Sequence, residues 1–374
     1  MPKHSDVAVV GGGVIGLACA WRISAAGHAV TVHDPAPASG ASWVAGGMLA
    51  PVTEATPGEE AVLALGAAGL DRWPGFAAEL AAHGDPGLRT EGTLVVAVDP
   101  GDRAELDRLA ERLARLGRHV DVVRGRGLRR AEPSLGPEVR SALSVPGDLA
   151  VDNRALLRAL LAACRAAGVR FSPHRCEALP ASAAVVIAAG ADSGFLHPAL
   201  RDAVRPVKGE IVRLRSRRGA LPPPSRTVRA LVGGRPCYFV PRDGGRLVLG
   251  ATQEEVGFDT EVTAGGVRRL LADAVRVLPA VEEYALEESS AGLRPGSPDG
   301  LPLIGALSPD VFAATGHGRG GLLLAPITAD AVLALLHGEA VAPEVAAADV
   351  TRFSVSGVTS PDSQRHSRVV GSWA

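Results

Sequence analysis

Three glycines near the start of this 374-residue chain constrain its fold more than any other feature. Gly11, Gly13 and Gly16 have the spacing G-x-G-x-x-G, directly after the apolar run DVAVV and at the start of the helical pattern VIGLACAWRISAAG. A second apolar strand, HAVTVHD, follows and ends at Asp34. Backbone amides at such a helix start can meet a pyrophosphate, and an acid after the second strand can accept hydrogen bonds from a ribose. The stretch therefore predicts a β-α-β unit that binds a dinucleotide.

The length predicts two domains, because one hydrophobic core rarely serves so many residues. The apolar segment 183–190 is typical of a further buried parallel strand, whereas residues 205–250 alternate short strands with turns, as in an antiparallel sheet. We therefore predict an α/β fold (α+β overall), with a Rossmann-like domain of separated segments and an antiparallel domain built between them. Further helices are predicted near 59–83, 101–116, 151–168, 263–277 and 319–337, and further strands near 92–98, 169–171, 286–293 and 311–315.

Composition excludes several classes of partner. The formal net charge is -1 and 47% of the residues are hydrophobic, so nothing attracts the whole chain to nucleic acid or an anionic membrane. The basic clusters at 124–130 and 213–219 lack interleaved aromatic residues and are interpreted as solvated loops or strand ends. No apolar stretch is long enough to span a bilayer. We expect neither a nucleic-acid nor a membrane partner.

The four cysteines predict a reducing compartment and no metal. Cys19, Cys164, Cys176 and Cys237 form no C-x-x-C pair and show no metal-ligand spacing with histidine. They are expected to be small buried hydrophobes. No secretory signal is recognised, and a cytoplasmic location is therefore expected.

Two later segments favour a flavin over a nicotinamide. Residues 40–51, GASWVAGGMLAP, are mostly small and would let the backbone pass close to a bulky ring system. Residues 316–336 form a glycine-rich turn followed by an apolar helix, whose N-terminal amides could face the negative charge of a reduced flavin. A glycine loop that merely caps an ordinary helix stays open as the alternative.

Arg294 is the single charged group within an otherwise apolar and turn-rich run, AGLRPG. A guanidinium and a carboxylate match as a planar fork, so Arg294 is predicted to bind the α-carboxylate of an amino acid. The alternative is a structural ion pair with a nearby acid such as Asp299.

Six motifs together resemble the FAD-dependent glycine oxidases of thiamin biosynthesis, within the superfamily of D-amino-acid and sarcosine oxidases. The resemblance extends to about residue 338, and its last two motifs are the most discriminating. The motifs are VVGGGVIG, GASWVAGGMLAP, PVKGE, CYFVPR, AGLRPGSPDGLPLIG and GHGRGGLLLAP.

The resemblance implies roles for individual residues. Arg294 would bind the substrate carboxylate with help from Tyr238, Arg319 would lie near the substrate, and Met48 would lie near the flavin. FAD would be bound non-covalently, because no cysteine follows Cys237, where that attachment occurs in sarcosine oxidases. The predicted FAD-contacting residues are Gly11, Gly13, Val14, Ile15, Gly16, Asp34, Ser42, Gly46, Gly47, Met48, Ala189, Gly190, Gly318, Arg319, Gly320, Gly321 and Leu322.

The implied activity is oxidative deamination of glycine and other small amines or amino acids, such as sarcosine and some D-amino acids. The substrate would pass a hydride to FAD, O2 would be reduced to H2O2, and the imine would supply thiazole synthesis or hydrolyse to the oxo acid. The resemblance also implies a homo-oligomer, for which the family suggests a tetramer. Glycine oxidases can carry histidine two positions before the tyrosine, where this chain has Pro236, and this departure leaves amine specificity open.

Three alternatives remain at this point: an FAD-dependent D-amino-acid or sarcosine dehydrogenase or oxidase with another electron acceptor, a nicotinamide-dependent dehydrogenase, and a flavin-binding module without turnover. The domain boundaries follow from the motifs. The FAD-binding domain is assigned to residues 1–82, 145–205 and 290–345, the substrate domain to 83–144 and 206–289, and a flexible tail to 346–374.

Overall fold

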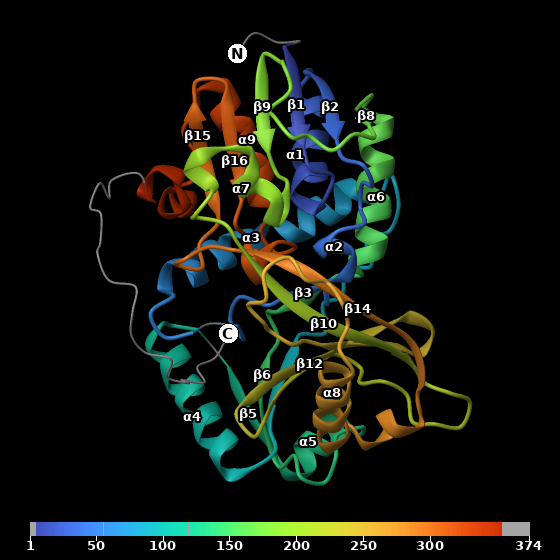
Figure 1. Cartoon of the computed structure of the whole chain (residues 1–374). Coiled ribbons are helices and arrows are strands. Elements are labelled where there is room, and N and C mark those ends of the chain that lie inside the picture. The colour runs from blue at the N-terminus through green and yellow to red at the C-terminus, as the bar shows by residue number, and fades with distance from the viewer. Residues whose placement is uncertain (1–4, 55, 119, 354–374) are drawn as a thin grey trace.

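The computed structural model describes residues 5–54, 56–118 and 120–353, which form two lobes (Figure 1). One lobe surrounds a six-stranded sheet in the order β15-β16-β9-β1-β2-β8. The other surrounds an eight-stranded sheet in the order β14-β10-β13-β12-β11-β4-β6-β5. The chain passes between the lobes several times, so each sheet collects strands that are far apart in the sequence.

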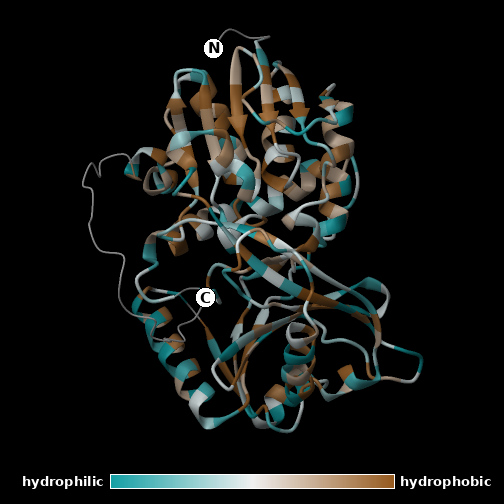
Figure 2. Cartoon of the chain, in the orientation of Figure 1, coloured by the Kyte–Doolittle hydropathy of each residue, from teal (hydrophilic) through white to brown (hydrophobic). Residues whose placement is uncertain are grey.

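The six-stranded sheet has the buried parallel character that its apolar strands predict. Neighbouring strands run parallel, except that β15 pairs antiparallel with β16 at one edge. Helices cover both faces, and the strands are coloured as strongly hydrophobic in Figure 2. Its elements are β1 (Asp6–Val10), α1 (Val14–Ala25), β2 (Ala29–His33), α6 (Asn153–Ala166), β8 (Arg170–Ser172), β9 (Ala184–Ile187), β15 (Leu303–Ser308), β16 (Val311–Thr315) and α9 (Ala325–His337).

The eight-stranded sheet is antiparallel except at one position. The predicted antiparallel sheet is thus confirmed, with one parallel pair, β4 and β11, that the sequence did not predict. The chain between them passes through the other lobe, so no hairpin imposes an antiparallel pairing. The strands are β4 (Thr93–Ala97), β5 (Asp121–Arg124), β6 (Ser141–Val145), β10 (Arg205–Arg215), β11 (Thr227–Val232), β12 (Arg235–Arg242), β13 (Arg246–Gly250) and β14 (Ala285–Gly296).

Apolar helix faces cover this second sheet. Helix α8 (Ala264–Val277) packs Leu270, Ala274 and Val277 into its main core. Helix α4 (Pro100–Arg115) buries Leu106, Leu109 and Leu113 in a smaller cluster. The remaining elements are α2 (Ala41–Val44), β3 (Met48–Leu49), α3 (Glu60–Leu80), α5 (Gly125–Ala131), β7 (Leu149–Ala150), η1 (Gly190–Asp192), α7 (Ser193–Leu196), η2 (Pro198–Leu200), η3 (Asp243–Gly245) and η4 (Pro279–Glu283).

Several short elements were not predicted from the sequence. Strands β5, β6, β7 and β15 are too short or too mixed for their periodicity to be read. Residues 125–131 form the short helix α5 and not a loop. Arg124, Arg126 and Arg130 are exposed, as predicted, whereas Arg129 turns inward and donates to the carbonyls of Leu135, Gly136 and Val139. Arg213, in the second basic cluster, is also largely buried.

The helix predicted at 319–337 begins later, at Ala325. A separate 3₁₀ turn, η5 (Gly318–Gly320), and a turn over 321–324 precede it, and Gly316 and Gly318 have positive φ values of 73° and 52° in the segment that leads into them. Most of α9 is buried, so it is an internal apolar helix.

Part of the predicted tail is packed against the first sheet. Residues Pro343–Ala348 (η6) and Val350–Phe353 (η7) form 3₁₀ turns, and Val350 lies in a buried cluster with Leu303. Arg352 adds an ion pair with Asp299 at 2.8 Å. The rest of the predicted tail, 354–374, lies outside the described residues. No helix among the described residues is long and apolar enough to cross a membrane.

Candidate active site

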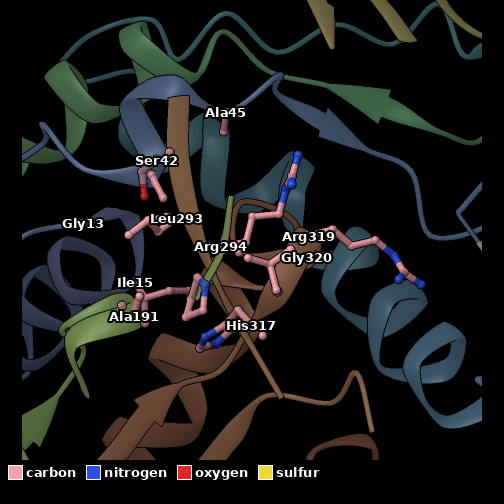
Figure 3. Close-up of a pocket in the computed structure, with 18 of the residues that line it drawn as sticks. Gly13, Ile15, Ser42, Ala45, Ala191, Leu293, Arg294, His317, Arg319 and Gly320 are labelled. Carbon is pink, nitrogen blue, oxygen red and sulfur yellow. The ribbon is translucent and has the colours of Figure 1, made fainter. Parts of the chain in front are cut away.

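One large cavity, of about 1210 Å³, connects the glycine turn of the first lobe with strands of the second (Figure 3). Pockets for a single small molecule usually measure about 300–1,000 Å³. The cavity therefore has room for a dinucleotide and a small second molecule. All the predicted FAD-contacting residues line it except Gly16.

The three motif glycines have different roles. A Cβ added to Gly11 would lie 2.3 Å from the carbonyl oxygen of Ala188, and one added to Gly16 would lie 1.9 Å from the carbonyl oxygen of Gly11. Both glycines are therefore required by close backbone packing. Gly13 faces open space apart from the Ser42 hydroxyl at 3.4 Å, so a phosphate group could approach the start of α1 there.

The first turn of α1 faces the cavity, and its backbone amides have no partner within the helix, as at every helix start. Ser42 Oγ accepts a hydrogen bond from Val14 N at 3.1 Å and brings the 40–51 segment onto this helix start. Val14 and Ile15 line the cavity beside it. This arrangement of small residues and free amides fits the pyrophosphate of FAD.

Asp34 follows β2 and is held at the cavity edge by two backbone amides. Its carboxylate accepts hydrogen bonds from Gly12 N at 2.6 Å and from Ala36 N at 2.7 Å. Because a carboxylate has further lone pairs, it can also accept from a ribose hydroxyl. Asp34 thus lies where the sequence motif predicts it.

Arg294 lies at the other end of the cavity, on β14 opposite Val207 of β10. Its side chain lies over Gly209, where an added Cβ would collide with the guanidinium. One hydrogen bond holds it, from Nη1 to the carbonyl oxygen of Thr252 at 3.3 Å. Among the described residues no carboxylate forms an ion pair with it, and Asp299 pairs with Arg352. The alternative of an Arg294–Asp299 ion pair is therefore wrong.

Tyr238 shares this end of the cavity. It lies on β12 in register with Gly250 of β13, and its ring fills space left by Gly46 and Gly250, since a Cβ on either would collide with it. Burial raises the pKa of the Tyr238 hydroxyl, and the positive charge of Arg294 acts in the opposite direction. The phenol and the guanidinium together form a donor pair suited to a carboxylate.

Met48 supplies an apolar wall between the two ends. It lies in β3 and packs in a cluster with Ile211, Val240 and Tyr238. The sulfur-bearing side chain adapts to irregular surfaces, which suits a wall that must accommodate a ring system.

The structure does not bring the Arg319 guanidinium to Arg294. The two side chains extend in different directions in Figure 3. Arg319 Nη2 pairs with the carboxylate of Glu59 and donates to the carbonyl oxygen of Glu54 at 3.2 Å. Its guanidinium is therefore occupied by these partners, which departs from the expected position near the substrate, although Arg319 itself lines the cavity.

His317 is a local hydrogen-bonding residue, as predicted. Its Nε2 lies 2.9 Å from Thr328 Oγ1. Burial lowers the pKa of its imidazole to about 3, so the ring is neutral. With so low a pKa the imidazole is a weak proton acceptor for a bound amine.

Sequence reasoning missed several cavity residues. Arg229 on β11 is the strand neighbour of Tyr238, and it donates to the carbonyl oxygen of Thr53. Glu54 lies 3.9 Å from Arg229, and Gln253 follows Thr252 on the cavity wall. No motif marks these residues, because only the folded sheets bring them together.

Three of the four cysteines are buried, and the fourth is partly buried and lines the cavity. Cys19, Cys164 and Cys237 are buried, as expected, and burial raises the pKa of Cys19 to about 12. Cys176 is only partly buried and lines the cavity, so the prediction of a buried hydrophobe is wrong there. Within the described part of the chain, no group of three or more metal-ligating side chains is close enough to hold an ion.

Comparison with known proteins agrees with this geometry. Residues 6–335 match the family described as FAD dependent oxidoreductase. The chain is 35% identical to the glycine oxidase of Geobacillus kaustophilus, over 94% of this chain and 98% of that protein. The crystal structure of glycine oxidase from Geobacillus kaustophilus superposes with a TM-score of 0.85, covering 94% of this chain and 99% of the other.

A second kind of relative is longer. The bifunctional protein ThiO/ThiG of Trichormus variabilis is 29% identical over 95% of this chain, which spans 56% of that protein. The family match covers most of the chain, and the cavity fits the cofactor that the family uses. The protein belongs to the family of FAD-dependent oxidoreductases, with FAD as its cofactor.

Proposed function

We propose that this protein catalyses the FAD-dependent oxidative deamination of glycine and other small amines and amino acids, with O2 as the electron acceptor. Sarcosine and some D-amino acids belong to the same substrate class. The observation that carries the proposal is the Arg294–Tyr238 donor pair, which shares one cavity with the dinucleotide-binding turn. The similarity to the glycine oxidase of Geobacillus kaustophilus, over 98% of that protein, supports the proposal.

In this proposal Arg294 and Tyr238 bind and orient the substrate carboxylate. Charge-assisted hydrogen bonds of this kind contribute about 1.5–3 kcal/mol each. Bound FAD supplies the two-electron acceptor, and the protein supplies orientation and charge. Met48 and the neighbouring apolar side chains keep water from the substrate. We assign no catalytic base, because His317 is buried, neutral and bonded to Thr328.

The overall reaction balances without another cofactor. The substrate amine loses two electrons and two protons to become the imine, and O2 gains them to become H2O2. Water then hydrolyses the imine of glycine to glyoxylate and ammonia. The ThiO/ThiG relatives support a second fate, in which the imine supplies the thiazole of thiamin.

Substrate preference, location and assembly complete the proposal. Pro236 offers no polar side chain to the amine, so the site should tolerate secondary amines such as sarcosine as well as glycine. The four free cysteines support a reducing, cytoplasmic location. We also propose a homo-oligomer, for which light scattering of the purified protein is the test.

Oxygen uptake, peroxide formation and glyoxylate release with glycine, sarcosine, D-alanine and D-proline test the function. We expect equal molar amounts of peroxide and glyoxylate from glycine. Reduction of the flavin without peroxide, together with turnover when an artificial quinone is added, would favour a dehydrogenase. Failure of every amine to reduce the flavin would overturn the proposed substrate class.

A further inference from the structure

A buried arginine lies behind the loop that carries Gly46, Gly47 and Met48. Arg242 ends β12, four residues after Tyr238, and its side chain is only 5% exposed. Its Nη2 donates to the carbonyl oxygen of Gly46 at 2.7 Å. Gly46 and Gly47 line the cavity, whereas Arg242 does not. The guanidinium therefore contacts the loop from the side opposite the cofactor.

Other donors hold the same loop from behind. Asn153 Nδ2 donates to the carbonyl oxygens of Ser42 and Trp43 at 2.9 and 2.8 Å. Arg154 and Arg213 also donate to the Trp43 oxygen, each at 3.3 Å. The carbonyls of this segment are thus turned away from the cavity and toward cationic and amide donors.

Arg154, Arg213 and Arg242 place positive charge close to the loop. Burial lowers the pKa of Arg213 and Arg242 to about 10, which still leaves both guanidinium groups charged at neutral pH. Opposing carboxylates are fewer and more exposed: Asp152 lies 3.7 Å from Arg242, and Glu288 lies 2.7 Å from Arg154. In a buried setting such charges act over longer distances than in water.

Peptide geometry links Arg242 to the cavity. In a trans peptide the C=O and the following N–H point in opposite directions. Because the Gly46 carbonyl points to Arg242, the Gly47 N–H points to the cavity side. Gly47 has a φ of 88° and no space for a side chain, since Arg242 Nη2 and the Val151 oxygen lie where its Cβ would be. Its own carbonyl accepts from Val151 N at 2.8 Å, which fixes the peptide from the other side.

We propose that Arg242 is a positioning residue for the flavin: it turns the Gly47 N–H toward the cavity that would hold the cofactor and places a buried positive charge behind the loop. Both effects favour the form of the cofactor that carries extra negative charge. The inference deepens the proposed function and rests on FAD binding in this cavity, but it does not depend on which amine is oxidised.

The test compares Arg242→Gln and Arg242→Lys with Arg246→Gln in the FAD-loaded enzyme. Arg246 is the cross-strand neighbour of Arg242, but its side chain is 60% exposed and pairs with Glu287. The measured quantities are the midpoint potential of the flavin and its dissociation constant for sulfite, an anion that adds to oxidised flavin. Neither quantity requires an amine substrate.

We expect Arg242→Gln to weaken sulfite binding about tenfold and to lower the midpoint potential by about 30 mV, which is a tenfold change for a two-electron couple. Arg242→Lys, which keeps the charge but shortens the contact with Gly46, should weaken sulfite binding by less, and Arg246→Gln should match the wild type. Wild-type potential and sulfite affinity in Arg242→Gln would overturn the inference, even if the variant melts at a lower temperature.

If Arg242→Gln does not fold or does not retain FAD, the test of the inference uses Arg242→Lys only. Sulfite affinity and FAD affinity equal to those of the wild type would then overturn the inference, and a loss in both would support it. If Arg242→Gln shows the expected lowering of the midpoint potential but the wild type oxidises no amine, the proposed substrates are rejected and the role of Arg242 stands.

Discussion

One end of the cavity is built from one continuous stretch of chain, residues 11–42. There the glycine turn, Ser42 and Asp34 are joined by hydrogen bonds between backbone amides and short side chains. At the other end Tyr238 and Arg294 come from separate strands of the second sheet, and Thr252 comes from the segment after β13. The first end depends on close backbone packing, whereas the second depends on two side-chain donors.

Substitutions at the two ends should therefore have different effects. A substitution at the nucleotide end adds atoms where none fit and should remove the cofactor. A substitution at the substrate end removes a donor and should weaken one ligand while the cofactor stays bound.

Gly16→Ala should abolish FAD binding. Its Cβ would lie 1.9 Å from the Gly11 carbonyl oxygen, and backbone cannot move aside as a flexible side chain can. Overpacking of this kind costs about 1–3 kcal/mol and distorts the turn. The flavin absorbance of the purified protein measures the effect, and Gly75→Ala, at an exposed position with no neighbour within 4 Å, is the control. A yellow Gly16→Ala protein with wild-type FAD affinity would contradict the packing argument.

Arg294→Leu should raise the KM for glycine by about two orders of magnitude while FAD stays bound. The loss corresponds to a charge-assisted bond of about 3 kcal/mol. Arg319→Leu is the matched control, because that guanidinium pairs with Glu59 and should have a much smaller effect on KM. Steady-state oxygen uptake measures both variants. An unchanged KM in Arg294→Leu would remove Arg294 from the substrate site.

Asp148→Asn should reduce the loss in the free energy of unfolding that the wild type shows between pH 4 and pH 8. Burial raises the pKa of Asp148 to about 7, well above the usual value of an aspartate. The folded state therefore keeps a proton that the unfolded chain releases, and stability is lost as pH rises from about 4 to about 7. The variant should lack this loss, which amounts to at least about 1.4 kcal/mol, the free energy of one pKa unit. Urea unfolding at both pH values is the measurement, and equal pH dependence in both proteins would contradict the assignment.

Tyr238→Phe should raise the KM for glycine about tenfold or less. The variant keeps the ring between Gly46 and Gly250 but removes one neutral donor, worth about 0.5–1.5 kcal/mol. Its flavin spectrum and melting temperature should match those of the wild type. An effect as large as that of Arg294→Leu would show that the phenol does more than assist the guanidinium.

The sequence predicts the nucleotide end well because its signals are local. Gly11, Gly13, Gly16 and Asp34 combine spacing with strand and helix patterns, and the structure places them together. At the other end only the residue type of Arg294 points to a carboxylate, and the role of Tyr238 followed from the family resemblance. Arg229 and Gln253 carry no sequence signal, since their positions depend on strand pairing.

The errors also have physical causes. Arg319 follows a glycine turn that does lie at the cavity, but its long side chain turns to Glu59, whose position cannot be read from the sequence. The parallel pairing of β4 with β11 depends on how the chain returns from the other lobe. Residues 346–353 lack a periodic pattern, yet Val350 finds a buried site against β15.

The most direct test of the account is an anaerobic titration of the FAD-loaded wild type, Arg294→Leu and Arg319→Leu with glycine, followed by the visible spectrum. We expect the same oxidised spectrum from all three proteins, and bleaching at low glycine concentrations only in the wild type and Arg319→Leu. Two results would contradict this account: bleaching of Arg294→Leu at the glycine concentration that bleaches the wild type, or no bleaching of the wild type. Either result would mean that the cavity does not combine an FAD-binding end with an end that binds the substrate carboxylate.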